Sequence, residues 1–141
     1  MKKLLWFLVK LAPVLYMGLI WTLSSFPSDA VVTFNVADTI IKESLHLIEF
    51  AILYVLLVLF FLVDGKLTKR INLSIALFAC FYGLLDEIHQ YFVPSRTSTV
   101  IDLIKDVTGV AICYWVVYRG YLLKKNTFGN FLASIEKLFS K

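Results

Sequence analysis

Long apolar runs separated by short polar stretches dominate this chain. Four of these runs, Leu4–Leu23, Leu45–Val63, Ile71–Tyr91 and Val100–Tyr118, are each close to 20 residues long. A helix needs about 20 apolar residues to cross the roughly 30 Å hydrocarbon core of a bilayer. The pattern therefore predicts an all-α membrane protein, with about four transmembrane helices in a compact bundle over residues 1–120.

The last segment, residues 121–141, has a different pattern. Its apolar residues recur at helical spacing, while Lys137 and Lys141 fall on other faces. A stripe of this kind is typical of an amphipathic helix that lies in the membrane interface. We expect a cytoplasmic amphipathic tail here, and a frayed tail is the alternative. The stripe consists of Phe128, Phe131, Leu132, Ile135, Leu138 and Phe139.

The composition agrees with a location in lipid. Of the 141 residues, 60% are hydrophobic, compared with about 45–50% in soluble domains. Lys10 interrupts the first run, but its long apolar stem lets the ammonium group reach the near interface. A signal peptide is the alternative for this run, because Met1-Lys2-Lys3 precedes it; however, no clean small-x-small cleavage site follows.

Two other features of the composition exclude common function classes. The net charge of +4 is accompanied by no nucleic-acid motif, so nucleic acid is not expected as a partner. The cysteines, Cys80 and Cys113, lie far apart inside apolar runs and have no CxxC spacing. They are interpreted as packing residues rather than as a disulfide or metal framework.

Lysine and arginine are distributed unevenly between the two predicted sides of the membrane. One side carries ten of them and the other carries only Lys42, Arg96 and Lys105. Cytoplasmic loops are enriched in these residues, so both termini should be cytoplasmic and the loops Ser24–Ser44 and Asp86–Thr99 should face outward. The ten are Lys2, Lys3, Lys66, Lys69, Arg70, Arg119, Lys124, Lys125, Lys137 and Lys141.

The acidic residues show the opposite distribution. Eight of the ten fall on or near the predicted outer side, and only Asp64 and Glu136 fall on the inner side. Ionisable groups at membrane depth are costly unless they pair or line a water-filled cavity. This concentration therefore predicts a functional site or a bound cation. The eight are Asp29, Asp38, Glu43, Glu49, Asp86, Glu87, Asp102 and Asp106.

Helical spacing places the polar residues in three rows near the outer ends of three predicted helices. The rows are Lys42, His46 and Glu49; Asp86, His89 and Gln90, with Glu87 beside them; and Asp102 and Asp106, followed by Gly109. Residues three or four apart share one helix face, and a glycine on that face permits close approach of another helix. Antiparallel packing should bring the three rows into one cluster beneath the outer surface.

Two kinds of chemistry are open to this cluster. The candidate catalytic residues are His46, Glu49, Asp86, Glu87 and Asp102, and a divalent cation held by His46, Glu49, Asp86 and Asp102 is one version of that chemistry. No compact metal signature such as H-E-x-x-H is present, so no cofactor is established. Each residue also has a structural interpretation, such as an interfacial histidine, a Glu49 pair with Lys42 or Arg96, or a helix end at the headgroups.

The other chemistry is ligand binding by polar groups around the cluster. Arg96 presents a planar fork of donors that suits phosphate or carboxylate, and the alternative is that it neutralises Asp86, Glu87 or Asp102. Ser98 or Thr99 is expected to cap the helix that begins near Val100. The candidate binding residues are Ser24, Ser25, Lys42, Gln90, Arg96, Ser98 and Asp106.

Four stretches of this sequence together resemble the VanZ-like family of bacterial membrane proteins. They are WTLSSFP at residues 21–27, HLIEF at 46–50, DEIHQYFVPSR at 86–96 and DLIKDVTG at 102–109. Their order and spacing match the family from about residue 20 to residue 110. The sequence departs from the family at Ser95, where glycine is common, and at Asp106, where asparagine is common. The second departure adds a negative charge to the cluster.

The resemblance implies a multi-pass protein of the bacterial cell membrane, and the namesake members are associated with low-level resistance to the lipidated glycopeptide teicoplanin. The leading hypothesis is an outward-facing site that binds a membrane lipid or a lipidated glycopeptide. Arg96 would hold an anionic group, while Trp21, Tyr91 and Phe92 would contact apolar parts at the interface.

Whether the protein is an enzyme stays open. The alternative hypothesis is a metal-assisted hydrolase or transferase that acts on a phosphate- or sugar-bearing envelope lipid. A channel or transporter is a third class, and it is disfavoured because the charged groups are confined to one side. The oligomeric state is left open.

Overall fold

The computed structural model describes residues 1–26, 36–94, 96, 98–123 and 127–139, with the side chains of the second helix described from His46 onward. Every regular element in these residues is helical. The elements are α1 (Lys2–Ser24), α2 (Val36–Leu62), α3 (Lys69–Tyr91), α4 (Val100–Val117), the short π-helical turn η1 (Tyr118–Leu122) and α5 (Thr127–Phe139).

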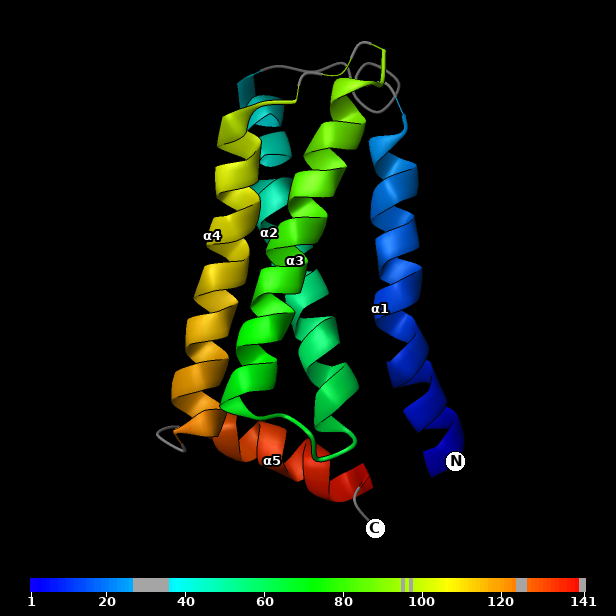
Figure 1. Ribbon diagram of the computed structural model, residues 1–141, viewed down its shortest axis with the longest axis vertical. Helices are drawn as coiled ribbons and strands as arrows, with labels where there is room; N and C mark the ends of the chain where they lie inside the picture. The colour runs from blue at the N-terminus through cyan, green and yellow to red at the C-terminus, as the bar shows by residue number, and fades with distance from the viewer. Residues whose placement is uncertain (27–35, 95, 97, 124–126, 140–141) are drawn as a thin grey trace.

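The four long helices form an up-and-down bundle, and α5 lies across one end of it (Figure 1). Helices α2, α3 and α4 pack against one another, and α1 packs against α2 and α3. The start of α1 and the whole of α5 lie at the same end (Figure 1). We call the opposite end, where α1 and α3 end and α4 begins, the polar end.

The apolar runs of the sequence correspond closely to the helices. The largest difference is at α2, which begins at Val36 rather than near Leu45. Residues 36–44 include good helix formers and contain neither glycine nor proline, so the backbone continues as a helix beyond the apolar run. The connection from α2 to α3 turns at Gly65, whose φ of 64° favours glycine.

Two helices, α1 and α3, are long and apolar enough to cross a membrane. The described apolar part of α2, His46–Leu62, is shorter. The 18 residues of α4 include Asp102, Lys105 and Asp106. The apolar character of α2 and α4 is thus interrupted by the ionisable residues of the polar end.

Much of the bundle's outer surface is apolar. On α1, only Pro13, Ile20 and Ser24 are buried, and large apolar side chains such as Val14 and Leu15 are more than 60% exposed. A soluble monomer rarely exposes contiguous apolar patches of this kind. A surface of this composition is suited to contact with lipid chains.

The core of the bundle ends against α5. Leu132 of α5 is buried with the core residues of α2, α3 and α4, and the Tyr121 hydroxyl donates to Glu136 Oε2 at 2.7 Å. Gly129 lies against the backbone of Gly120 so closely that a Cβ there would collide with the Gly120 carbonyl oxygen. The helix predicted for the tail is confirmed. Leu132 and Ile135 of its apolar stripe pack on the bundle, whereas Phe128, Phe131 and Leu138 are exposed.

Lys10 joins α1 to the turn after α2. Its ammonium group donates to Asp64 Oδ2 at 2.7 Å and to the Phe60 carbonyl at 2.5 Å, and Trp6 Nε1 donates to Asp64 Oδ1 at 2.9 Å. Phe60 lies in the last turn of α2, where carbonyl groups lack partners within the helix. The hydrogen bonds from Lys10 and Trp6 hold the pKa of Asp64 below its usual value.

Replacing Lys10 with methionine should lower the free energy of unfolding at pH 7 by about 1–2 kcal/mol, because a hydrogen-bonded charge pair is lost. The Asp64 carboxylate is stabilised in the folded state, so this contribution is complete above the unfolded pKa and is lost as the pH falls through the lower folded pKa. Thermal unfolding in detergent should therefore separate wild type from Lys10→Met at pH 7, and the difference should be smaller at an acidic pH below the usual pKa of aspartate.

Lys66→Met is the matched control, because Lys66 Nζ lies 3.5 Å from the same carboxylate but is 66% exposed. It should unfold like wild type at both pH values. Equal effects of the two substitutions would contradict the role given to Lys10.

Candidate functional site

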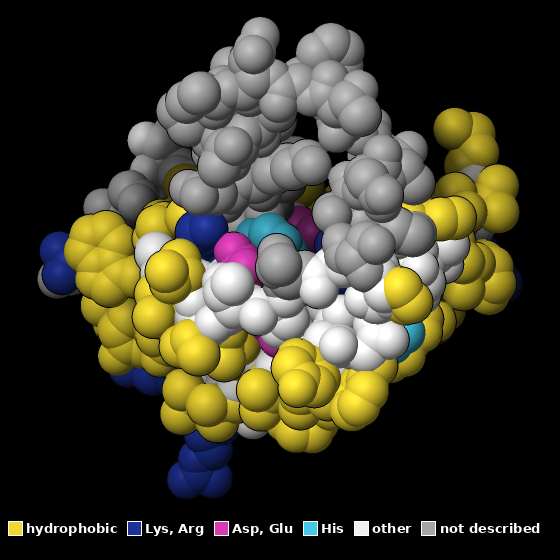
Figure 2. All heavy atoms as spheres, turned by 90° about the horizontal axis from the view of Figure 1, so that it is seen from above, with side chains coloured by type: hydrophobic (Ala, Val, Ile, Leu, Met, Phe, Trp, Pro, Cys, Tyr) yellow, Lys and Arg dark blue, Asp and Glu magenta, His cyan; other side chains and the backbone are white. Residues whose placement is uncertain are grey.

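The polar end gathers the described members of the three polar rows that the sequence predicted. Seen from above, acidic side chains and one histidine lie near the centre of this end, and hydrophobic side chains surround much of its rim (Figure 2). The described polar residues form two hydrogen-bonded or closely packed groups, which share α3 but face different neighbouring helices.

The first group consists of His46 on α2, Glu87 on α3 and Asp106 on α4, and we call it the His46 group. One ligand atom from each residue lies within 4.8 Å of the other two. His46 Nδ1 is 3.4 Å from Asp106 Oδ1 and 4.0 Å from Glu87 Oε1. Asp106 is completely buried and Glu87 is 5% exposed.

Most of the polar atoms in the His46 group have no hydrogen-bond partner among the described residues. They are His46 Nδ1, Glu87 Oε1 and both carboxylate oxygens of Asp106. The other oxygen of Glu87 accepts a hydrogen bond of 2.7 Å from the Ser98 hydroxyl. Buried polar atoms without partners are costly, so the group is built to receive a proton, a cation or a donor from a ligand.

Two glycines allow the helices to bring the His46 group together. A Cβ on Gly109 of α4 would overlap the carbonyl oxygen of Leu47 on α2, so α4 touches the α2 backbone one residue from His46. A Cβ on Gly83 of α3 would lie 3.4 Å from Asp106 Oδ2. The close approach that the sequence predicted at Gly109 is confirmed.

The second group joins α1 to α3 and is centred on Asp86. Its Oδ2 atom accepts from Ser24 Oγ at 2.9 Å and from Gln90 Nε2 at 2.5 Å. All three residues are buried. Asp86 Oδ1 is also buried and has no hydrogen-bond partner in the part of the chain that the structure describes.

Arg96 completes the second group from the side of α1. Its Nε donates to Gln90 Oε1 at 3.0 Å, and its Nη1 donates at 3.0 Å to the carbonyl oxygens of Leu23 and Phe26. A basic side chain near a helix C-terminus commonly satisfies the last carbonyls in this way. Arg96 is therefore linked to Asp86 through Gln90 and anchors the end of α1.

Ser25 and Asp102 make local contacts at the same end. Ser25 Oγ lies 3.0 Å from Nε2 of His89, whose ring stacks on Trp21 with centroids 4.0 Å apart. Asp102 accepts from Thr99 Oγ1 at 2.6 Å and from Lys105 Nζ at 3.0 Å, while Thr99 caps α4. Of the two predicted capping residues, Thr99 caps α4 and Ser98 binds Glu87.

The four residues predicted as ligands of one metal ion therefore do not form one group in the structure. His46 lies in the group described above, Asp86 lies in the second group, and Asp102 is engaged within the first turn of α4. Glu49 is partly buried one turn after His46 on α2. The side chain of Lys42, a candidate binding residue, lies outside the described residues.

The metal ligands predicted from the sequence included His46 but neither Glu87 nor Asp106. Glu87 was a catalytic candidate and Asp106 a binding candidate. A signal was present, because a glycine stands about one turn from each carboxylate: Gly83 precedes Glu87 by four residues, and Gly109 follows Asp106 by three.

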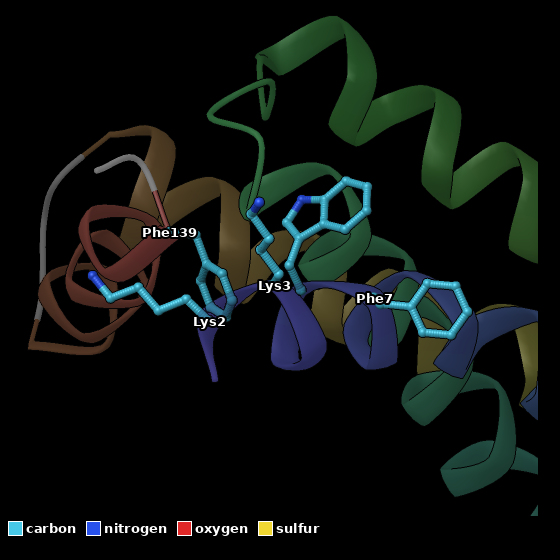
Figure 3. A pocket seen from close by; sticks show the side chains of 5 residues that line it. Lys2, Lys3, Phe7 and Phe139 are labelled. Atoms are coloured by element: carbon cyan, nitrogen blue, oxygen red, sulfur yellow. The ribbon is translucent and has the colours of Figure 1, made fainter.

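A hollow at the opposite end carries different chemistry. It is lined by Lys2, Lys3, Trp6, Phe7 and Phe139, from the start of α1 and the end of α5 (Figure 3). Two cations beside aromatic rings are typical of the headgroup region of a membrane. None of the predicted site residues lies there.

A bundle of apolar helices with buried ionisable groups at one end is typical of helical membrane proteins with a polar site. The chain matches the VanZ/LLP1 family model over residues 4–124, which is most of its length, so it belongs to the VanZ/LLP1 family of membrane proteins. The predicted VanZ resemblance is confirmed over a longer stretch than the motifs covered. No curated protein and no solved structure matched the chain.

Proposed function

We propose that this VanZ-family protein binds the headgroup of a lipid-linked or lipidated amphiphile at its polar end, and thereby changes the response of a bacterial cell envelope to teicoplanin-like drugs. The observation that carries the proposal is the buried Oδ1 atom of Asp86, a carboxylate oxygen that has no hydrogen-bond partner among the described residues. Such an acceptor suits hydroxyl and amine donors, which glycosylated amphiphiles provide.

Exposed aromatic side chains supply an apolar contact at the same end as this acceptor. Tyr91 and Phe92, where α3 ends, are 74% and 76% exposed, and Trp21 is exposed near the end of α1. Aromatic residues favour the membrane interface because their rings are apolar and their edges tolerate water. An amphiphile with its polar group at this carboxylate would place its acyl chain against these rings and the apolar helix surfaces.

The proposed orientation follows from the distribution of charge. All four long helices would cross the membrane, with both termini in the cytoplasm and the polar end outside. The N-terminal lysines and the turn at Lys66 would then lie inside, as positive residues in short loops generally do. The placement of α5 at the same end as the start of α1 is what an even number of crossings requires (Figure 1).

Arg96 has a positioning role in this proposal. Its Nε and Nη1 atoms are used by Gln90 and by the last carbonyls of α1. By holding Gln90 against Asp86, it keeps one carboxylate oxygen occupied and the other available.

Drug susceptibility tests the proposal. A glycopeptide-sensitive bacterium that expresses wild type should become less sensitive to teicoplanin while its sensitivity to unlipidated vancomycin is unchanged. Asp86→Asn should lose this protection, because an amide replaces the anionic acceptor with a partly donating group. Phe92→Ser should weaken it, because the apolar contact is lost.

Lys66→Met at the opposite end is the control and should protect like wild type, with membrane levels of all proteins compared directly. Full protection by Asp86→Asn at a normal level would refute binding at this group. Absence of protection by well-expressed wild type would refute the link to teicoplanin-like drugs.

A further inference from the structure

We propose that the His46 group binds one divalent transition-metal ion, of the zinc type, between α2, α3 and α4. The ligand atoms are His46 Nδ1, Glu87 Oε1 and an oxygen of Asp106. The proposal rests on the geometry and burial of these atoms, and it does not depend on the amphiphile.

The separations of the three ligand atoms fit a single ion. Ligand atoms at about 2.0–2.1 Å from a tetrahedral zinc ion lie about 3.3 Å from one another. The distance from His46 Nδ1 to Asp106 Oδ1 is 3.4 Å, and that to Glu87 Oε1 is 4.0 Å. All three ligand atoms lie within 4.8 Å of one another, so the side chains would close around the ion by moving toward it.

Charge and hydrogen bonding also favour a cation. Two carboxylates lie together in a buried position, and a protonated His46 would balance only one of their charges. Asp106 is fully buried, and neither of its oxygens has a hydrogen-bond partner in the described ranges. An ionised carboxylate in a buried position is costly unless it is paired or coordinates a metal. His46 lies 3.4 Å from Asp106, and a divalent ion would compensate the charges of both carboxylates at once.

The surroundings orient the ligands. Ser98 donates to Glu87 Oε2, which directs Oε1 into the group, and Gly83 and Gly109 hold α3 and α2 close to α4. Hydrogen bonds to the outer atoms of metal ligands are a regular feature of such sites. The close contact at Gly109 thus keeps His46 and Asp106 near each other before an ion binds.

The donor set indicates the kind of ion and its chemistry. One imidazole and two carboxylates suit zinc, manganese or cobalt better than magnesium or calcium, which prefer oxygen ligands alone. Three protein ligands leave a coordination position for water or for an oxygen of a bound headgroup. Asparagine is common in the family at the position of Asp106. The metal site is therefore proposed for this chain and not for the family as a whole.

Metal binding to the purified full chain tests the proposal. Protein in detergent is stripped with a chelator and titrated with Zn²⁺ by calorimetry and with Co²⁺ by visible absorption. Wild type should bind one ion per chain. Asp106→Asn and His46→Gln should each weaken binding more than about 100-fold, and Ser98→Ala should weaken it by about 10–100-fold, as loss of an outer partner does.

Asp102→Asn is the matched control, because this carboxylate lies on the same helix but is engaged by Thr99 and Lys105. It should weaken metal binding far less than Asp106→Asn, because its charge acts on the group only from a distance. Equal affinity of the Asp102→Asn and Asp106→Asn proteins, or no ion bound by folded wild type, would overturn the proposal. His46→Gln provides a second variant if Asp106→Asn does not fold.

The metal titration and the drug susceptibility test distinguish the metal site from the proposed function. If the purified wild type binds metal but cells that express it are as sensitive to teicoplanin as before, the cation site is supported and the drug-related role is refuted. Drug protection that persists in a variant unable to bind metal would leave the amphiphile proposal standing, because the titration alone decides the metal site.

Discussion

Replacing Gly109 with alanine is expected to destabilise the protein by about 2 kcal/mol. It should also weaken the binding of zinc by the His46 group. A Cβ at this position would overlap the carbonyl oxygen of Leu47, which is backbone and cannot move aside as a flexible side chain can. Overpacking costs about 1–3 kcal/mol and occasionally more, which exceeds the gain of up to about 1 kcal/mol from the better helix propensity of alanine.

The expected mechanism is separation of α4 from α2. Asp106 lies one turn before Gly109, so a shift of α4 at the glycine would move the carboxylate away from His46. Thermal unfolding in detergent measures the loss of stability, and the zinc titration measures the change at the site. Both should respond to Gly109→Ala.

Gly18→Ala on α1 is the matched control. A Cβ on Gly18 would meet nothing within 4 Å, so only the change in helix propensity remains, and the stability should be equal to wild type or slightly higher. The same loss of stability at both glycines would show that close helix contact is not the reason for the effect at Gly109.

Replacing Arg96 with methionine is expected to release the end of α1. The guanidinium group donates to the carbonyls of Leu23 and Phe26 and to Gln90. A hydrogen bond that involves a charged group contributes about 1.5–3 kcal/mol, and because two of these bonds are exposed we expect a total loss of about 2–3 kcal/mol. The thermal midpoint in detergent should fall accordingly.

Hydrogen exchange localises this effect. Amides in the last turns of α1 should exchange faster in Arg96→Met, while those of α4 should be little changed. Arg96→Lys should be intermediate, because a single ammonium group cannot reproduce the fork of donors. Arg70→Met, an exposed arginine at the other end of the bundle, should behave like wild type. Uniform acceleration of exchange in every helix would argue against a local anchor.

The contacts of α1 show how a largely exposed helix is held. Lys10 binds the turn after α2, the Tyr82 hydroxyl donates to the Met17 carbonyl at 2.7 Å, and Arg96 binds the last carbonyls. In lipid, no hydrophobic driving force brings helices together, so close packing and polar contacts determine helix association. Charge and hydrogen bonding at both ends therefore supplement the few buried apolar contacts of α1.

Much of the fold was predictable from the sequence, because length and apolar content determine where a long helix forms. The four apolar runs became α1 to α4, and the amphipathic pattern of the tail became α5. The concentration of carboxylates near three helix ends also indicated one polar region, since helical spacing determines which residues of one helix share a face. Gly109 was recognisable as a contact point for the same reason.

The sequence by itself determined the helices, the polar region and the family, whereas the tertiary structure decided which polar residues meet. Asp86 and Glu87 are neighbours, and because successive residues of an α-helix point about 100° apart, Asp86 faces Ser24 of α1 while Glu87 faces His46 and Asp106. Helical spacing groups residues only within one helix. The contacts between helices depend on their rotation and separation, and the close approach of α4 to α2 at Gly109 is one determinant of both.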